Sequence, residues 1–197
     1  MTKLQKRILE ISYKNQLSHL GSCLTALPII EEIFETKKPN EKFALSAGHA
    51  ALALYCVLEA KGGRNAEEIW QHHGTHPDRC NDCGIDFSSG SLGHGIGAAI
   101  GMALAERNKN VYCLMSDGEC AEGSVYEALR VAYEQKLHNL KIYVNINGWG
   151  AYKRIEPTFI SRTLRAFWHT NFNPIKIYKT NTDEFPFLQG QDAHYYK

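Results

Sequence analysis

The fold is decided by residues 111–150, which read VYCLMSDGECAEGSVYEALRVAYEQKLHNLKIYVNINGWG. This stretch predicts a buried strand that ends before Asp117, then a helix, then a second strand that ends before Asn147. A strand–helix–strand unit returns the second strand parallel to the first. We therefore expect Asp117 and Asn147 at the same carboxyl edge of a parallel sheet, where open α/β sheets bind their ligands.

These two side chains have the chemistry of a cation site. A carboxylate and an amide carbonyl are hard oxygen ligands that suit Mg²⁺ or Ca²⁺, and such sites leave further positions to water and substrate phosphates. Taken singly, Asp117 could instead cap the following helix, and Asn147 could occupy an Asn-Gly turn. The residues alone leave both interpretations open.

The remaining chain alternates between helical and strand patterns. Helices are predicted near 3–15, 25–36, 48–61, 93–107, 121–136 and 157–168, and strands near 42–45, 110–116, 140–146 and 174–180. This alternation predicts a doubly wound α/β fold, a parallel sheet with helices on both faces. A length of 197 residues with 44% hydrophobic content suits a single domain over 1–197. The turn-rich stretch 64–92 is predicted to be a long loop, and loops of this length are usually functional or disordered.

Composition excludes several classes of partner. The chain has 22 Lys and Arg against 21 Asp and Glu, so no bulk charge draws it to nucleic acid or to a membrane. No apolar run approaches the roughly 20 residues that span a bilayer. The start of the chain is an amphipathic helix pattern and not a signal peptide, which predicts a cytoplasmic location. We accordingly interpret the six cysteines as reduced thiols.

One cysteine pair has metal-ligand spacing. Cys80 and Cys83 are separated by two residues, and His72, His73 and His76 precede them. Such a cluster could bind zinc. The alternative that we favour is a reduced, solvent-facing pair in a loop that needs no metal.

Five blocks in a particular order resemble one family. The Asp-Gly-Glu segment is preceded by LSHLGSCLTALPIIEEIF (17–34), FALSAGHAALALYCVLEAKG (43–62), THPDR (75–79) and GIDFSSGSLGHGIGAAIGMALAER (84–107). In this order they resemble the amino-terminal, diphosphate-binding half of transketolase, most closely the small subunit of the split-gene form. The resemblance covers residues 1–155, with a weaker echo in 174–197, and implies the thiamine-diphosphate-binding fold.

The resemblance implies a role for particular residues. Asp117, Asn147 and the main-chain oxygen of Trp149 would bind Mg²⁺ or Ca²⁺. Thiamine diphosphate would contact residues of the glycine loops and their neighbours, namely His49, Ser91, Leu92, Gly93, His94, Gly118, Glu119 and Asn147. The catalytic histidines would be His19, His49, His76 and, less closely matched, His194. A neutral imidazole can both donate and accept a proton near neutral pH.

The resemblance also implies what the chain would need. Nothing here resembles the pyrimidine-binding domain, so a separate pyrimidine-binding, C-terminal transketolase subunit is expected, in a heterotetramer with two copies of each chain. The enzyme would transfer a two-carbon ketol unit between sugars or sugar phosphates, with the carbanion chemistry supplied by the cofactor. Alternatives are another carboligase or decarboxylase, of the deoxyxylulose-phosphate synthase kind, and a non-catalytic shortened paralogue that acts as a binding subunit.

The chain departs from the family pattern in two places. Ser116 replaces the first Gly of the Gly-Asp-Gly signature. Between about 155 and 174 the chain passes from one short helix almost directly to the last strand, so an internal part of the usual domain is expected to be missing.

Overall fold

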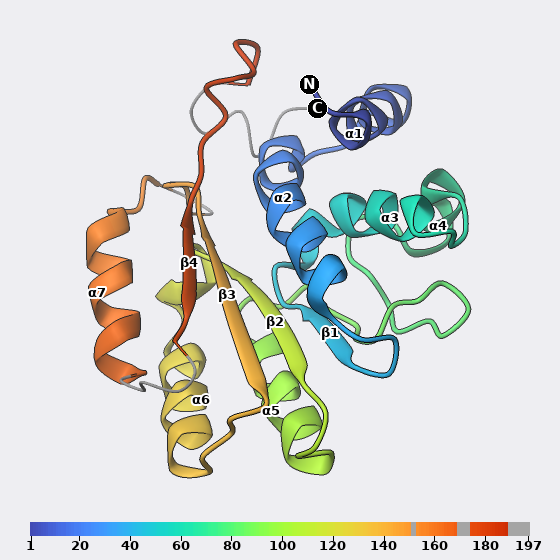
Figure 1. Ribbon diagram of the computed structural model, residues 1–197. Helices are drawn as coiled ribbons and strands as arrows, with labels where there is room; N and C mark the ends of the chain where they lie inside the picture. The colour runs from blue at the N-terminus through green and yellow to red at the C-terminus, as the bar shows by residue number, and fades with distance from the viewer. Residues whose placement is uncertain (151–152, 169–173, 189–197) are drawn as a thin grey trace.

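A four-stranded parallel sheet forms the centre of the protein (Figure 1). The structure is a computed structural model that describes residues 1–150, 153–168 and 174–188. The strands are β1 (Lys42–Leu45), β2 (Val111–Ser116), β3 (Leu140–Ile146) and β4 (Lys176–Lys179). They lie in the order β1-β2-β3-β4, and every neighbouring pair is parallel. The predicted parallel sheet is therefore confirmed, with strand order following chain order over the described residues.

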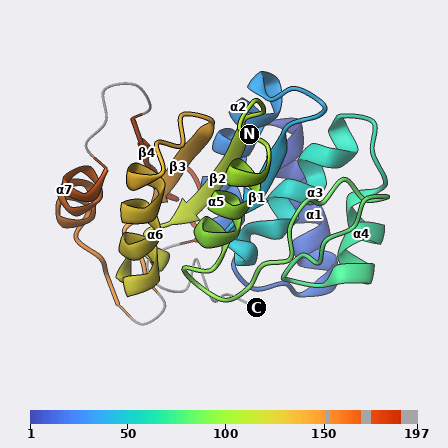
Figure 2. The ribbon, with the colours of Figure 1, turned by 90° about the horizontal axis from the view of Figure 1, so that it is seen from below.

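Helices cover both faces of the sheet, as predicted. The first group comprises α1 (Lys3–Asn15), α2 (Leu20–Thr36), α3 (Ala51–Ala60) and α4 (Ala66–His73), and the second comprises α5 (Gly95–Ala105), α6 (Gly123–Glu134) and α7 (Pro157–Phe167). Two short 3₁₀ turns, η1 (Gly48–Ala50) and η2 (Glu119–Ala121), precede α3 and α6. In Figure 2 the sheet lies between α2 on one side and α5 and α6 on the other.

Each face of the sheet has its own hydrophobic core because side chains alternate along a strand. Tyr112 and Leu114 of β2 pack with the α1–α4 group. Cys113 and Met115 of the same strand pack with α5, α6 and α7. All six residues of β2 are buried, as expected for a central strand covered on both sides.

The predicted long loop 64–92 contains a helix, which corrects the sequence interpretation. Helix α4 occupies Ala66–His73, and the Asn65 side chain caps it by accepting the backbone N–H groups of Glu67 and Glu68 at 2.9 and 3.3 Å. Ala66 and Ile69 are the buried residues of this helix. Asn65 followed by Glu67 and Glu68 is a sequence signal for the start of a helix. The helix has only eight residues, which is too short for a clear apolar periodicity. Helix α2 likewise begins at Leu20, earlier than the predicted 25.

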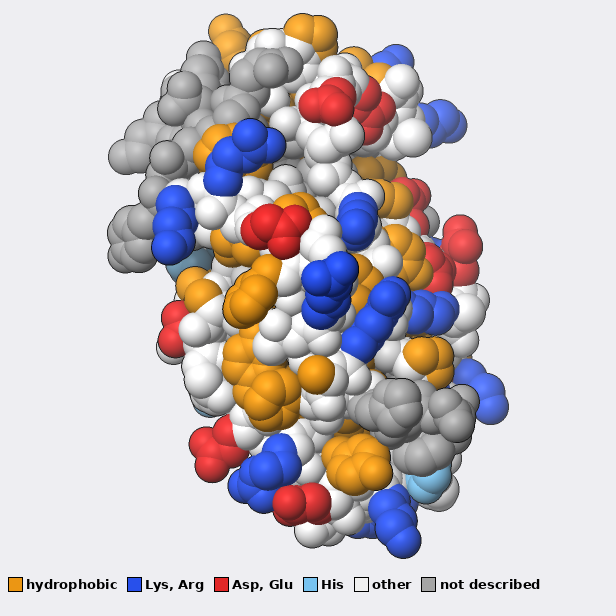
Figure 3. Space-filling view, turned by 90° about the vertical axis from the view of Figure 1, so that its left-hand side faces the viewer, with side chains coloured by type: hydrophobic (Ala, Val, Ile, Leu, Met, Phe, Trp, Pro, Cys, Tyr) orange, Lys and Arg blue, Asp and Glu red, His pale blue; other side chains and the backbone are white. Residues whose placement is uncertain are grey.

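Helix α7 covers the edge of the sheet near β4 (Figure 1). Ile160 and Leu164 are buried, whereas Phe159 and Phe167 remain 64% and 46% exposed. Figure 3 looks onto this side, where hydrophobic side chains are interspersed with Lys and Arg. Among the described residues no helix is both long and apolar enough to cross a bilayer.

The cysteines divide into two kinds. Cys23, Cys56, Cys113 and Cys120 are buried free thiols, as expected. Cys80 and Cys83 form a disulfide, so the prediction of reduced thiols is wrong for this pair. Cys83 is also buried, with 4% exposure, and does not face solvent. The tight turn between the two cysteines brings their side chains together on one side of the loop.

Candidate functional site

A cavity of about 170 Å³ lies at the carboxyl edge of the sheet. The ends of β2 and β3, the start of α2, the turn before α3 and the loops 76–92 and 147–150 surround it. Its lining residues are His19, Ser22, His49, His76, Gly90, Leu92, Ser116, Asp117, Gly118, Asn147, Trp149 and Gly150. Asp117 and Asn147 are thus brought to one cavity, as the strand–helix–strand argument predicts.

Asp117 is a fully buried acid at the end of β2. Its Oδ1 accepts the backbone N–H of Gly118 at 3.0 Å, and its Oδ2 accepts that of Gly148 at 2.7 Å. Burial raises the pKa of Asp117 to about 6, although these N–H groups oppose the shift. No Lys or Arg of the described chain forms an ion pair with this carboxylate. A cation bound beside it would supply the missing positive charge.

Asn147 and Trp149 lie in a tight loop that follows β3. The Asn147 Oδ1 accepts the backbone N–H of Trp149 at 3.0 Å, so this amide closes an Asx turn. The loop folds back on itself through an isolated bridge between Trp149 and Arg154, whose guanidinium lies 5.4 Å from the indole ring. Local hydrogen bonding therefore holds both predicted metal-binding residues against the cavity.

Three predicted histidines converge on this cavity from separate segments. His19 and His49 have ring centroids 5.3 Å apart, and His76 lines the same space. His19 has a φ of 63° immediately before α2, a conformation uncommon for a residue with a side chain and often found at functional sites. Burial, and then the charge of His76, lower the pKa of His19. His19 is therefore a neutral imidazole at neutral pH, able to donate and accept.

Ser116 adds a polar group that the family signature lacks. Its hydroxyl is buried, lines the cavity and has no hydrogen-bond partner among the described residues. A buried hydroxyl of this kind costs free energy unless something in the cavity bonds to it. The Asp117 carboxylate likewise has no ion-pair partner among the described residues. Both observations fit a cavity that holds a polar ligand and a cation.

Four residues predicted to bind the cofactor do not line the cavity: Ser91, Gly93, His94 and Glu119. Ser91 and His94 are exposed. The rings of His94 and Phe87 pack with their centroids 5.6 Å apart. Leu92, which lies between them in the sequence, does line the cavity.

Glu119 instead accepts a set of buried hydrogen bonds. It is fully buried, and its carboxylate accepts the Ser46 hydroxyl and the backbone N–H groups of Gly93 and Ser116, the latter two at 3.0 and 3.1 Å. These bonds join the ends of β1 and β2 to the glycine loop. Burial raises the pKa of Glu119 despite them.

Sequence reasoning missed four lining residues, Ser22, Gly90, Ser116 and Gly150. Ser22 belongs to the same block as His19, and its position three residues after that histidine was the available signal. Gly90 has a φ of 153°, and a Cβ there would lie 3.2 Å from the His76 ring. His194 lies outside the described residues.

The fold and this cavity define a class: an open parallel α/β protein with a polar, acid-containing cavity at the carboxyl edge of its sheet. The chain belongs to the transketolase family, since the family "Transketolase, thiamine diphosphate binding domain" matches residues 7–183.

Two curated relatives illustrate the similarity. The chain is 32% identical over 188 residues to one of the subunits of an apulose-4-phosphate transketolase from Phocaeicola vulgatus, covering 84% of this chain and 66% of that protein. It is 37% identical over 153 residues to human transketolase, covering 67% of this chain and 24% of the relative. The chain therefore spans slightly less than two thirds of the first relative and about a quarter of the second.

Solved structures show the same fold. The chain superimposes on transketolase from Campylobacter jejuni with a TM-score of 0.69 at 20% identity, covering 98% of this chain and 39% of that one. Transketolase from Leishmania mexicana gives a TM-score of 0.63 at 19% identity, with 91% and 37% covered. The predicted fold class is thereby confirmed.

Proposed function

We propose that this chain is the diphosphate-binding subunit of a heteromeric, thiamine-diphosphate-dependent transketolase that transfers a two-carbon ketol unit between sugars. The observation that carries this proposal is the convergence of Asp117, Asn147 and three imidazoles on one cavity at the carboxyl edge. Family membership makes thiamine diphosphate the cofactor of this domain type.

Asp117 and Asn147 would hold Mg²⁺ or Ca²⁺, with Trp149 providing its main-chain oxygen. The donor set fits a hard cation, because it consists of oxygens and leaves positions open for phosphate and water. Among the described residues, the Asp117 carboxylate has no ion-pair partner and the Ser116 hydroxyl has no hydrogen-bond partner. Both features support occupation of the cavity by a charged, oxygen-rich group. When bound, thiamine diphosphate supplies the carbanion chemistry of ketol transfer.

The histidines would act on the sugar. His19 is neutral, so it can accept a hydroxyl proton and return one within the same cavity. His49 and His76 face it from other segments and would orient neighbouring hydroxyl groups. The backbone of His19 has a positive φ, which is a strained conformation for a residue with a side chain. Such strain is retained where a functional site requires a particular side-chain geometry.

A separate pyrimidine-binding subunit would complete the enzyme. The family match is to a thiamine diphosphate binding domain, and the Phocaeicola vulgatus relative is named as one subunit of its transketolase. We propose a heterotetramer with two copies of each chain, located in the cytoplasm, where the four buried free thiols would remain reduced. The single domain over 1–197 would be shortened between about 155 and 174.

Sugar phosphates are the substrate class we favour, because the relative's name specifies a phosphorylated sugar. The phosphate-recognising groups are expected largely on the partner, since this cavity is lined by one acid and no lysine or arginine among the described residues.

Reconstitution tests the proposal. The chain alone and the chain mixed with the pyrimidine-domain subunit from the same genome would be assayed for ketol transfer with thiamine diphosphate and Mg²⁺. We expect no turnover from either chain alone and turnover from the mixture. Turnover by the purified single chain would contradict the split enzyme, and an inactive but stably assembled complex would favour the non-catalytic binding subunit.

A further inference from the structure

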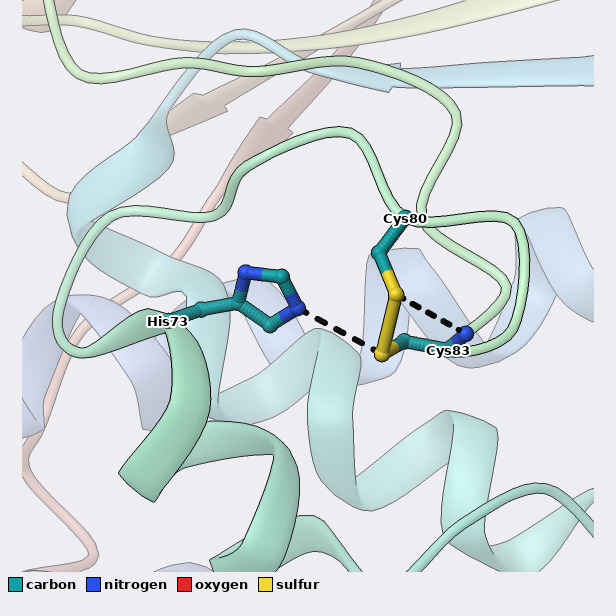
Figure 4. A group of neighbouring side chains, drawn as sticks. All are labelled: His73, Cys80 and Cys83. Carbon is teal, nitrogen blue, oxygen red and sulfur yellow. Dashed lines mark hydrogen bonds between the residues drawn. A yellow bond between two sulfur atoms is a disulfide. The ribbon is translucent and has the colours of Figure 1, made fainter.

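A second cluster of chemically reactive side chains lies outside the cavity. His73, at the end of α4, places its Nε2 3.4 Å from the Sγ of Cys83, and Cys80 joins the pair through a disulfide. Figure 4 shows the imidazole directed at the two sulfurs from a different segment of the chain. The three donor atoms lie within 4.8 Å of one another.

One of these separations, between His73 Nε2 and Cys83 Sγ, is close to that of a tetrahedral zinc site. With Zn–S of about 2.3 Å and Zn–N of about 2.1 Å, neighbouring ligand atoms in such a site lie roughly 3.5–3.8 Å apart. The imidazole and the nearer sulfur are already close to that separation. Reduction of the disulfide frees the sulfurs to move apart around an ion.

The turn that carries the cysteines directs one backbone N–H at a sulfur. The backbone N–H of Cys83 donates to the Sγ of Cys80 at 3.2 Å, which favours a negatively charged sulfur. Gly84 follows with a φ of 76°, which lets the chain reverse immediately after the second cysteine. Cys80 and Ile85 then exchange two backbone hydrogen bonds of 2.9 Å, so the turn is closed at its base.

We propose that the reduced His73–Cys80–Cys83 cluster is a zinc site and that its disulfide is the oxidised, metal-free state of the same cluster. A cellular dithiol would pass two electrons and two protons to the pair and become a disulfide itself. Zinc then displaces the two thiol protons and binds both sulfurs and the neutral imidazole, with water in the fourth position. The donor geometry thus reverses the sequence-based expectation of a metal-free pair.

The ion would fix one wall of the main cavity. From the cysteine turn the chain returns on itself, with the N–H of Ser89 bonded to the carbonyl of Pro77 at 3.0 Å. Just beyond these bonds, His76 and Gly90 both line the cavity. Zinc would tie this hairpin to the end of α4, so loss of the metal would loosen the segment that presents His76.

Metal analysis of the full chain tests the inference. The protein would be purified with a thiol reductant and zinc, dialysed exhaustively without chelator, and assayed by mass spectrometry for zinc. We expect about one zinc per chain, and loss of at least about nine tenths of it in Cys83→Ser and in His73→Ala. His72→Ala is the matched control, because His72 is an exposed neighbour on the same helix that lies outside the cluster.

Two further measurements separate this site from the cavity and from misfolding. Asp117→Ala should keep its zinc, so failure of the proposed cofactor site would leave this result unchanged. In the reduced wild-type chain, zinc should protect the partly exposed Cys80 from alkylation, and a chelator should remove this protection. Reduced wild-type protein that retains no zinc, or a Cys83→Ser variant that retains a full equivalent, would overturn the inference.

Discussion

Replacing Asp117 with Asn should stabilise the ligand-free protein increasingly as pH rises. The Asp117 carboxylate is fully buried without a positive partner among the described residues, and its pKa is raised to about 6 from 3.8. Between these two values the folded protein binds more protons than the unfolded chain, so folding stability falls as pH increases. Asn removes this titration while preserving the shape of the side chain.

The size of the expected change in unfolding free energy follows from the shift in the pKa of Asp117. A difference of 6 − 3.8 = 2.2 pH units, at about 1.36 kcal/mol for each unit, corresponds to about 3 kcal/mol at about pH 8. The same linkage gives about 1 kcal/mol at about pH 4.5, where both states are partly protonated. The stability of Asp117→Asn relative to wild type should therefore rise by about 2 kcal/mol over this range.

Urea denaturation in chelator at the two pH values measures this difference. Comparing the change with pH cancels any constant cost of placing an amide NH₂ against the backbone N–H groups of Gly118 and Gly148. Asp183→Asn, at an exposed acid, is the control and should show no such trend. A pH-independent difference between Asp117→Asn and wild type would refute the idea of an uncompensated buried carboxylate awaiting a cation.

Four further substitutions test individual residues of the glycine loop, helix α5 and the cavity. Gly93→Ala should destabilise the protein by more than about 1 kcal/mol, since its φ is 74° and a Cβ would lie 2.5 Å from Ser124 Oγ. Gly97→Ala in α5, where a Cβ meets nothing within 4 Å, should instead stabilise it by up to about 1 kcal/mol in the same denaturation assay. His19→Ala should lower kcat/KM of the reconstituted enzyme by roughly ten- to a thousandfold with little change in unfolding free energy; unchanged kinetics would assign it a structural role. Ser116→Gly should weaken cofactor binding measured by calorimetry if the hydroxyl bonds the ligand, and unchanged affinity would remove that contact.

The sequence predicted the parts of the fold that depend on periodicity. Strands β1, β2 and β3 fall where alternating and continuous apolar runs are bounded by turn residues. Helix α4 was not predicted, because eight residues show too little hydrophobic periodicity to distinguish a helix from a loop. Its N-cap at Asn65 was the only strong local signal.

The site was predictable where topology alone places residues. Asp117 and Asn147 follow adjacent parallel strands, so their meeting at one edge required only the strand–helix–strand unit. Glu119 could not be placed in this way, because its burial depends on Ser46 and Gly93, which come from distant segments. The Cys80–Cys83 pair was predicted wrongly as reduced and solvent-facing, because its disulfide and the burial of Cys83 depend on how the loop folds, which the two-residue spacing does not reveal.

A calorimetric titration of thiamine diphosphate into the complex of this chain with the proposed pyrimidine-domain subunit tests the proposed cation site directly. We expect binding in Mg²⁺, little binding in chelator, and weak binding by Asp117→Ala in either condition, because the proposed cation site depends on the buried carboxylate of Asp117. Equal affinity of wild type and Asp117→Ala in Mg²⁺, or wild-type affinity unchanged by the chelator, would contradict this proposal.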